Sequence, residues 1–156
     1  MVKNSPLHVD LGSGAGLPGV IISIVSKGTV ICVESKAKKR RFLKEVKGSL
    51  NLKNLEIFDG DVQLFSSQFS GRLIQTLSAK AFAKPPKLMW YLSMFNHCCL
   101  KNSECIVPIS KDQKKHLRYT DEIKTIITND TEFYYFRIPM KDLPYYKADL
   151  EKRYSL

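Results

Sequence analysis

The chain has few cysteines and no long apolar run. Its four cysteines are Cys32, Cys98, Cys99 and Cys105, and their spacing matches no metal site. Cys32 and Cys105 lie in apolar, strand-like runs, where a buried thiol is the ordinary interpretation. No stretch reaches the roughly 18 apolar residues of a membrane span. Residues 1–6 lack the apolar segment of a signal peptide. We therefore expect no metal, no membrane partner and a cytoplasmic location.

Acidic residues are also scarce. The 156 residues include 15 Asp and Glu against 25 Lys and Arg, which gives a formal net charge of +10. Cations cluster at 36–41 and 111–118. Either run alone is typical of a solvated helix face, but the two together on a basic chain favour a nucleic-acid partner. The predicted phosphate contacts are Lys38, Lys39, Arg40 and Lys114.

Short apolar segments alternate with amphipathic ones along the chain. Strands are predicted at 7–11, 29–33, 55–58, 73–79 and 105–109. Pro18 is expected to open the first helix. A second helix over 36–50 would present an apolar stripe, and a third would follow Pro85-Pro86. The stripe of the second helix is Phe42, Leu43, Val46 and Leu50; that of the third is Leu88, Tyr91, Leu92, Phe95 and Cys99.

The last third of the chain predicts a hairpin. Residues 123–128 and 132–138 flank Asn129-Asp130, a turn-forming pair. Alternating strands and helices imply an α/β fold with a parallel sheet, helices on both faces and an antiparallel hairpin at one edge. With 44% hydrophobic residues, the chain is expected to form one domain over 1–138, followed by a polar tail at 139–156.

A glycine-rich loop follows the first predicted strand. Residues 10–19 are DLGSGAGLPG. Such a loop lets the backbone approach a ligand where a side chain would collide. Gly14, Gly16 and Gly19 also satisfy the dinucleotide pattern, with Glu34 at the spacing of its acidic residue. Asp10 favours S-adenosylmethionine, because an acid before the glycines suits an amine and a sulfonium and would repel a pyrophosphate. A turn without a ligand is the third alternative.

These residues carry a resemblance to a known family. The loop from Asp10 to Gly19, with its Leu17-Pro18-Gly19 extension, resembles that of the bacterial small-subunit rRNA guanine-N7 methyltransferases, once called glucose-inhibited division protein B. Residues 34–43 resemble the second motif of that family, and Lys80-Ala81-Phe82-Ala83 resembles its Arg-Ala-Phe-Ala signature. The resemblance implies a Rossmann-like, class I S-adenosylmethionine-dependent methyltransferase fold. It also implies 16S rRNA in the 30S subunit as partner, and we expect a monomer.

The resemblance also implies roles for individual residues. Gly12 and Leu17 would contact S-adenosylmethionine, and Glu34 would bind its ribose hydroxyls. Lys80 takes the position of the arginine that contacts the cofactor in the family, and it is the one candidate for a part in catalysis. The complete set of predicted cofactor contacts is Asp10, Gly12, Gly14, Gly16, Leu17, Glu34, Asp61, Val62, Gln63 and Lys80.

Methylation of guanine at N7 needs few catalytic groups. Guanine N7 has an exposed lone pair and no proton, so its methylation needs positioning rather than a base or a covalent nucleophile. Methylation of an exocyclic amine commonly uses Asn/Asp-Pro-Pro-aromatic, whereas this chain has Lys84-Pro85-Pro86-Lys87. The family also has a helical segment before the loop, most of which this sequence lacks, and Lys80 replaces its arginine. An active rRNA methyltransferase and a weak or inactive relic that binds RNA or cofactor therefore both stay open.

Overall fold

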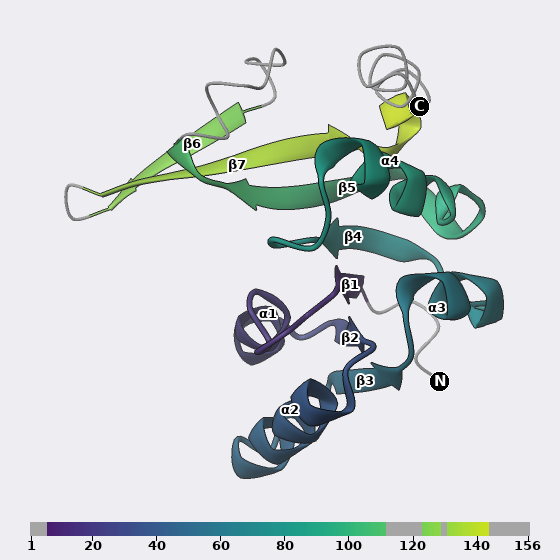
Figure 1. The fold of residues 1–156 in the computed structure, drawn as a ribbon, viewed down its shortest axis with the longest axis vertical. Helices are drawn as coiled ribbons and strands as arrows, with labels where there is room; N and C mark the ends of the chain where they lie inside the picture. Colours follow the sequence, from purple (N-terminus) through teal and green to yellow (C-terminus); the bar gives the residue numbers. More distant parts are fainter. Residues whose placement is uncertain (1–5, 112–122, 129–130, 144–156) are drawn as a thin grey trace.

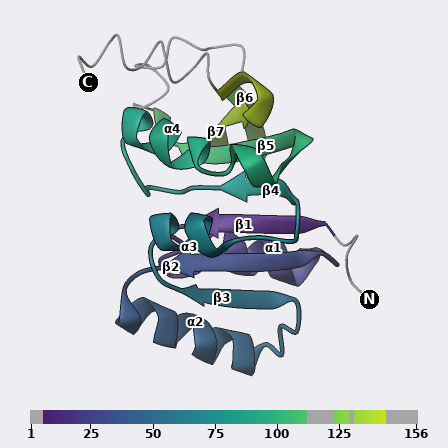
Figure 2. The same cartoon turned by 90° about the vertical axis from the view of Figure 1, so that its right-hand side faces the viewer.

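A twisted, mostly parallel sheet forms the centre of the molecule (Figure 1). The computed structural model describes residues 6–111, 123–128 and 131–143. Seven strands pair in the order β3-β2-β1-β4-β5-β7-β6, and Figure 2 shows β5, β4, β1, β2 and β3 in succession. The strands are β1 (Leu7–Leu11), β2 (Thr29–Glu34), β3 (Leu55–Asp59), β4 (Ile74–Ser78), β5 (Cys99–Ile109), β6 (Ile123–Thr128) and β7 (Thr131–Pro139).

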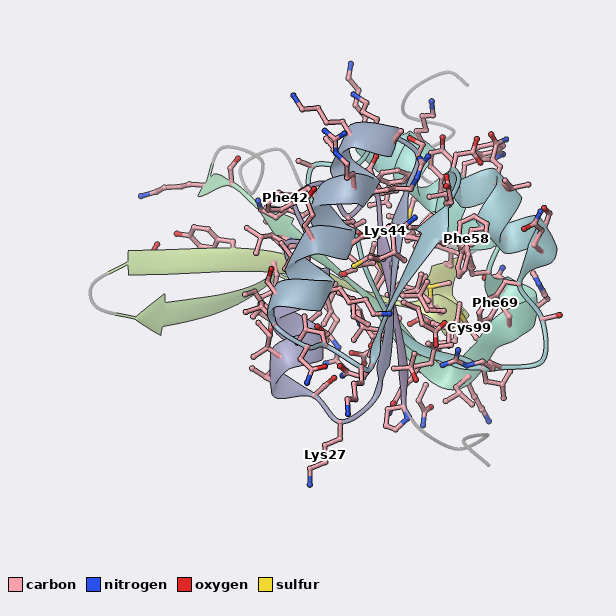
Figure 3. The ribbon with its side chains drawn as sticks, turned by 90° about the horizontal axis from the view of Figure 1, so that it is seen from below. Lys27, Phe42, Lys44, Phe58, Phe69 and Cys99 are labelled. Atoms are coloured by element: carbon pink, nitrogen blue, oxygen red, sulfur yellow. The ribbon has the colours of Figure 1, made fainter. Side chains whose placement is uncertain are left out.

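Helices cover both faces of the sheet (Figure 1). They are α1 (Gly19–Val25), α2 (Ala37–Ser49), α3 (Val62–Gln68) and α4 (Pro85–Ser93). The first two lie on one face and the other two on the opposite face, as Figure 3 shows from below. No described helix is long and apolar enough to cross a membrane. The expected α/β class, parallel sheet and antiparallel hairpin are confirmed.

The order of the strands reverses between β1 and β4. From β1 the chain moves outward through β2 to β3, and then returns to add β4 and β5 on the other side of β1. In open parallel sheets of this kind, ligands bind beyond the carboxyl ends of the strands at this switch point. The loops after β1, β2, β3 and β4 therefore share one rim, and these loops hold the predicted cofactor contacts.

Two hydrophobic clusters lie on the two faces of the sheet. Side chains alternate along each strand, so Leu7, Val9 and Leu11 of β1 face α3 and α4, where the larger cluster lies. The smaller cluster lies under α1 and α2 and consists of Val20, Val30, Cys32, Leu43, Leu52 and Leu55. His8 and Asp10, the other two side chains of β1, are buried as well.

Two details of the predicted helices are wrong. In α2, Leu43 of the expected stripe is buried and Val46 packs partly buried against the smaller cluster, whereas Phe42 and Leu50 are about half exposed, because α2 covers only the edge of the sheet at β2 and β3. Cys99 is not helical: it begins β5, which starts six residues earlier than expected. Tight turns after α4, such as the bond from Phe95 N–H to the Leu92 carbonyl, keep Phe95 in the core without extending the helix.

The β6–β7 hairpin extends away from the rest of the sheet on the side of α1 and α2 (Figures 1 and 3). β7 pairs antiparallel with β5 from Tyr134 to Pro139. Met140 and Leu143 follow β7 and are buried in the larger cluster, so the chain stays in contact with the domain through Leu143. The rest of the expected tail, 144–156, lies outside the described residues, and the boundary at 138 stays a prediction.

Candidate functional site

The loop between β1 and α1 requires glycine at several positions. Gly12, Gly14 and Gly16 have φ angles of +66°, +59° and +89°, in the left-handed region that side chains disfavour. The loop closes on itself, since Gly16 N–H donates to the Ser13 carbonyl at 2.7 Å. A Cβ added at Gly12 would overlap the ring of Phe82. The loop is therefore a tight backbone structure at the switch point.

Glu34, at the end of β2, holds the middle of this loop. Its two carboxylate oxygens accept hydrogen bonds from the N–H groups of Gly14 and Lys36, both at 2.8 Å. Its side chain is almost fully buried. A carboxylate oxygen has two lone pairs, so each oxygen retains one for a further donor such as a ribose hydroxyl. The geometry is compatible with the predicted role of Glu34, which stays a prediction.

Asp10 is more enclosed than its place beside the glycines suggests. The carboxylate is buried, and its oxygens accept from Gly19 N–H at 3.1 Å and from the Ser78 hydroxyl at 2.6 Å. Burial raises the pKa of Asp10, while the hydrogen bonds from Ser78, Ser13 and Gly19 lower it. This carboxylate thus holds the end of the loop at the start of α1. Its direct contact with a ligand amine stays a prediction.

The carboxyl end of β3 lies next to that of β2, since Asp59 pairs with Glu34 in the sheet. Just beyond it, Asp61 is the N-cap of α3 and accepts from Leu64 N–H at 2.8 Å. Val62 points into the larger hydrophobic cluster, whereas Gln63 is exposed. The exposed side chains of Asp61 and Gln63 lie at the rim, and the predicted cofactor contacts of Asp61, Val62 and Gln63 stay predictions.

The segment after β4 approaches the loop through an aromatic side chain. Phe82 lies against Gly12, and its ring is 4.9 Å from that of Tyr91. Ala81, between Phe82 and Lys80, has a φ of +50°, an uncommon value for a residue other than glycine. Lys80 itself is exposed. Sequence reasoning identified Lys80 and missed Phe82, although Phe82 belongs to the same four-residue motif.

The predicted RNA contacts differ in their surroundings. Lys38 and Lys39 are exposed at the start of α2. The Lys39 ammonium lies 3.8 Å from the point that a Cβ of Gly14 would occupy, and so borders the loop. Arg40 is mostly buried: it pairs with Asp59 at 2.6 Å and donates to the carbonyls of Glu34 and Ser35. Lys114 lies outside the described residues.

Arg40 therefore joins the carboxyl ends of β2 and β3. Its guanidinium is engaged with protein atoms, so it is a weaker candidate for a phosphate contact than its two lysine neighbours. A run of cations looks uniform in the sequence, whereas the pairing of β2 with β3 brings Asp59 within reach of Arg40. The role of the run in RNA binding stays a prediction.

A hollow lies between β3 and α3. A cavity of about 350 Å³ between β3 and α3 is lined by Phe58, Phe65 and Phe69, with Glu56 and Arg72 among its other lining residues. Figure 3 labels Phe58 and Phe69 on the side of the strands opposite Phe42 of α2. None of the predicted cofactor contacts lines this cavity. In the described part of the chain, no group of three or more His, Cys, Asp or Glu could hold a metal.

Comparisons with known proteins identify a family. The family model GidB, described as rRNA small subunit methyltransferase G, matches residues 1–128. The chain belongs to this family. The rRNA small subunit methyltransferase G of Ruthia magnifica subsp. Calyptogena magnifica is 33% identical over 107 residues, which are 68% of this chain and 49% of that protein. The protein of the same name from Magnetococcus marinus is 32% identical over 120 residues, 72% of this chain and 52% of that protein.

Solved structures show the same fold. An RNA methyltransferase from Salinibacter ruber, in complex with S-adenosyl-L-homocysteine, has a TM-score of 0.60 at 14% identity and covers 88% of this chain and 84% of its own. An rRNA methylase from Streptococcus thermophilus has a TM-score of 0.59 at 14% identity, over 88% of this chain and 89% of its own. The chain spans about half the length of the curated relatives that it matches.

Proposed function

We propose that this chain binds S-adenosylmethionine on the rim formed by the loops after β1, β2, β3 and β4, and that it transfers the methyl group to N7 of a guanine in 16S rRNA. The observation that carries the proposal is the glycine loop. It lies at the switch point and is held by Glu34 through Gly14 N–H, in a chain of the methyltransferase G family. The family assignment also favours S-adenosylmethionine over a dinucleotide.

The residues at the rim fit such a cofactor. The absence of a side chain at Gly14 leaves room for close approach, and Glu34 has spare acceptor capacity for hydroxyl donors. Gln63, one of the predicted cofactor contacts, is exposed just beyond the end of β3. The charge of Asp10 gives no support for a cationic ligand, because its carboxylate is directed to Gly19 and Ser78.

In this proposal the protein catalyses the reaction by positioning guanine N7 against the methyl group of the cofactor. S-adenosylmethionine supplies an electrophilic methyl group whose bond to sulfur breaks as the lone pair of N7 forms the new bond. Because N7 carries no proton, no side chain has to accept one. The rim holds the cofactor, while the exposed cations Lys38 and Lys39 on α2 attract RNA phosphates. Correct placement of two reactants accounts for much of the rate that such an enzyme needs.

Lys80 is the side chain that we place beside the reacting groups. It follows β4, is exposed, and is joined through Ala81 to Phe82, which lies on the loop. A lysine presents a point charge, whereas an arginine presents a planar fork of donors. Lys80→Ala should therefore lower methyl transfer with little change in the unfolding free energy, and Lys80→Arg should preserve or raise the transfer. An expected monomeric state and cytoplasmic location stay predictions.

The proposal is tested in two steps. Calorimetric titration with S-adenosylmethionine should show binding, and the same titration with NAD should show none; the reverse result would refute the assignment of the loop. The protein is then incubated with tritiated S-adenosylmethionine and 30S subunits that lack the methyl group. Methylation at N7 makes the RNA chain cleavable by borohydride and aniline, whereas methylation of an exocyclic amine does not. Binding without transfer would favour the inactive relic.

A further inference from the structure

A chain of buried polar groups crosses the sheet beneath the glycine loop. In the register of β1 with β4, His8 lies opposite Thr76 and Asp10 lies opposite Ser78. The His8 ring nitrogens contact the Thr76 hydroxyl at 2.7 Å through Nδ1 and the Ser78 hydroxyl at 2.9 Å through Nε2. Ser78 donates to Asp10 at 2.6 Å, and Asp10 accepts from Gly19 N–H at 3.1 Å.

The hydrogen bonds of this chain run in one direction. A serine hydroxyl has a single proton, and Ser78 donates it to Asp10, so Ser78 must accept from His8 Nε2–H. In a neutral ring with its proton on Nε2, Nδ1 has no proton and accepts from the Thr76 hydroxyl. Burial lowers the pKa of His8 to about 4, in agreement with a neutral ring. Every member of the chain thus has a partner.

The buried polar groups that are linked by these hydrogen bonds lie among apolar side chains. Val30 and Cys32 of β2 lie next to His8 and Asp10 in the sheet and belong to the apolar cluster under α1. His8, Asp10 and Ser78 are each more than nine-tenths buried. Burying polar groups among apolar ones lowers stability unless hydrogen bonds compensate. The group at the end of the chain is Gly19, the first residue of α1 and the end of the glycine loop.

We infer that His8 and Ser78 are positioning residues for the ligand loop, acting through Asp10. They hold the Asp10 carboxylate in the orientation that fixes Gly19, just as Glu34 fixes Gly14 in the middle of the same loop. A side chain at Gly19 would collide with Asp10 and Cys32, so the start of α1 lies directly against this carboxylate. This inference rests on the proposed function, since the loop is taken to bind S-adenosylmethionine.

Ser78→Ala tests the inference, and Ser103→Ala is the matched control. Ser103 is also a fully buried strand serine, but it donates to the Ile74 carbonyl at 2.5 Å, away from the loop. Ser103→Ala loses one buried hydrogen bond, whereas Ser78→Ala loses two, the bond to Asp10 and the bond from His8, and should lose more stability. The dissociation constant for S-adenosylmethionine should rise about tenfold for Ser78→Ala, equivalent to about 1.4 kcal/mol, and less than about twofold for Ser103→Ala. In the transfer assay, KM should rise with little change in kcat.

Amide hydrogen exchange of Gly19 gives a second readout that needs no cofactor. Exchange at Gly19 should be faster in Ser78→Ala than in wild type, and unchanged in Ser103→Ala. His8→Leu should act like Ser78→Ala, and His8→Gln, which keeps a side-chain N–H, should restore part of the protection. If Ser78→Ala fails to fold, the two His8 variants decide the matter by the same measurements.

The outcomes separate this inference from the proposed function. If Ser78→Ala matches Ser103→Ala in affinity and in Gly19 exchange, the positioning role is refuted. A weaker affinity with unchanged Gly19 exchange also refutes it, because the effect would not pass through Asp10. If the wild type binds no S-adenosylmethionine, the proposed function fails, and Gly19 exchange alone decides whether His8 and Ser78 hold the loop.

Discussion

The ring of Phe82 lies directly against Gly12, so that the segment after β4 closes over the first glycine of the loop after β1. The two residues are far apart in the sequence and meet because β1 and β4 are neighbours in the sheet. Gly12 is thus constrained twice: by its φ of +66° and by the aromatic ring above it. Gly14 has a similar φ of +59°, but the nearest atoms to an added Cβ would be at an ordinary distance of 3.8 Å.

This difference predicts that Gly12→Ala is more harmful than Gly14→Ala. Both alanines would adopt a left-handed conformation, which costs about 1–2 kcal/mol. Gly12→Ala should lose about 1–3 kcal/mol more, because its methyl group overpacks against Phe82. Urea unfolding measures both values. Adding Phe82→Leu to Gly12→Ala should recover part of the extra loss, and equal losses for the two alanines would show that the ring exerts no constraint.

Glu34 should matter for both stability and cofactor affinity. Glu34→Ala leaves the N–H groups of Gly14 and Lys36 without their acceptor, and the unfolding free energy should fall by about 1–3 kcal/mol. Glu34→Gln should recover less than half of this loss, since its amide offers one oxygen acceptor where the structure uses two. Calorimetry should show weaker S-adenosylmethionine binding for both variants.

Glu45→Gln is the matched control for the removal of a negative charge. Glu45 lies on the exposed face of α2, where Arg41 is 3.9 Å away. Exposed pairs of this kind contribute little to stability. Glu45→Gln should therefore leave both unfolding and cofactor binding unchanged. A comparable loss of affinity in this variant would mean that general charge, rather than the contact with Gly14, explains the effect of Glu34.

The sequence predicted the order of the strands, the helices α1, α2 and α4, the glycine loop and the acid at the end of β2, because each depends on local spacing. It gave no prediction for α3, whose seven residues follow Asp61. The contacts that fix the loop were not predictable in this way. His8 meets Ser78 across 70 positions of the sequence, and Ser78 meets Asp10 across 68. Such contacts depend on which strands become neighbours and in which register. The same reason explains why Arg40 was grouped with its lysine neighbours.

Substitutions in the basic run should separate RNA binding from fold maintenance. Lys38→Gln with Lys39→Gln should weaken binding to 16S rRNA and leave the unfolding free energy nearly unchanged, because both side chains are exposed. The dependence of affinity on salt should become shallower, by roughly 0.7–0.9 in the slope for each phosphate that the variant no longer binds. Filter binding at several salt concentrations measures this slope, and an unchanged slope would contradict a role in phosphate binding.

Arg40→Gln should have the opposite profile. The substitution removes the pair with Asp59 and the bonds to the carbonyls of Glu34 and Ser35, so the ends of β2 and β3 lose their link. We expect a loss of about 1–3 kcal/mol in urea unfolding, with the salt slope of RNA binding unchanged. A decrease in slope equal to that of the lysine variants would instead identify Arg40 as a phosphate ligand.

The buried histidine gives the protein a specific dependence on pH. Burial lowers the pKa of His8 from about 6.5 to about 4, so the unfolded chain takes up a proton at a higher pH than the folded one. The contribution of neutral His8 to the free energy of unfolding is complete above pH 6.5 and is lost progressively as the pH falls toward 4. Asp10 acts in the opposite sense, because its raised pKa lets the folded state bind a proton first.

Lowering the pH from about 7 to about 5 should therefore reduce the free energy of unfolding of the wild type by about 2 kcal/mol through His8. This value follows from about 1.36 kcal/mol for each unit of difference between the folded and unfolded pKa. The measurement is urea unfolding at both pH values, for the wild type and for His8→Leu. The leucine variant has no imidazole at this position, so its stability should fall less over the same interval. His97 is exposed and is present in both proteins, so its contribution cancels between them. Equal losses in the two proteins would mean that the His8 ring is already protonated in the folded state, and Nδ1 would then donate to the Thr76 hydroxyl instead of accepting from it.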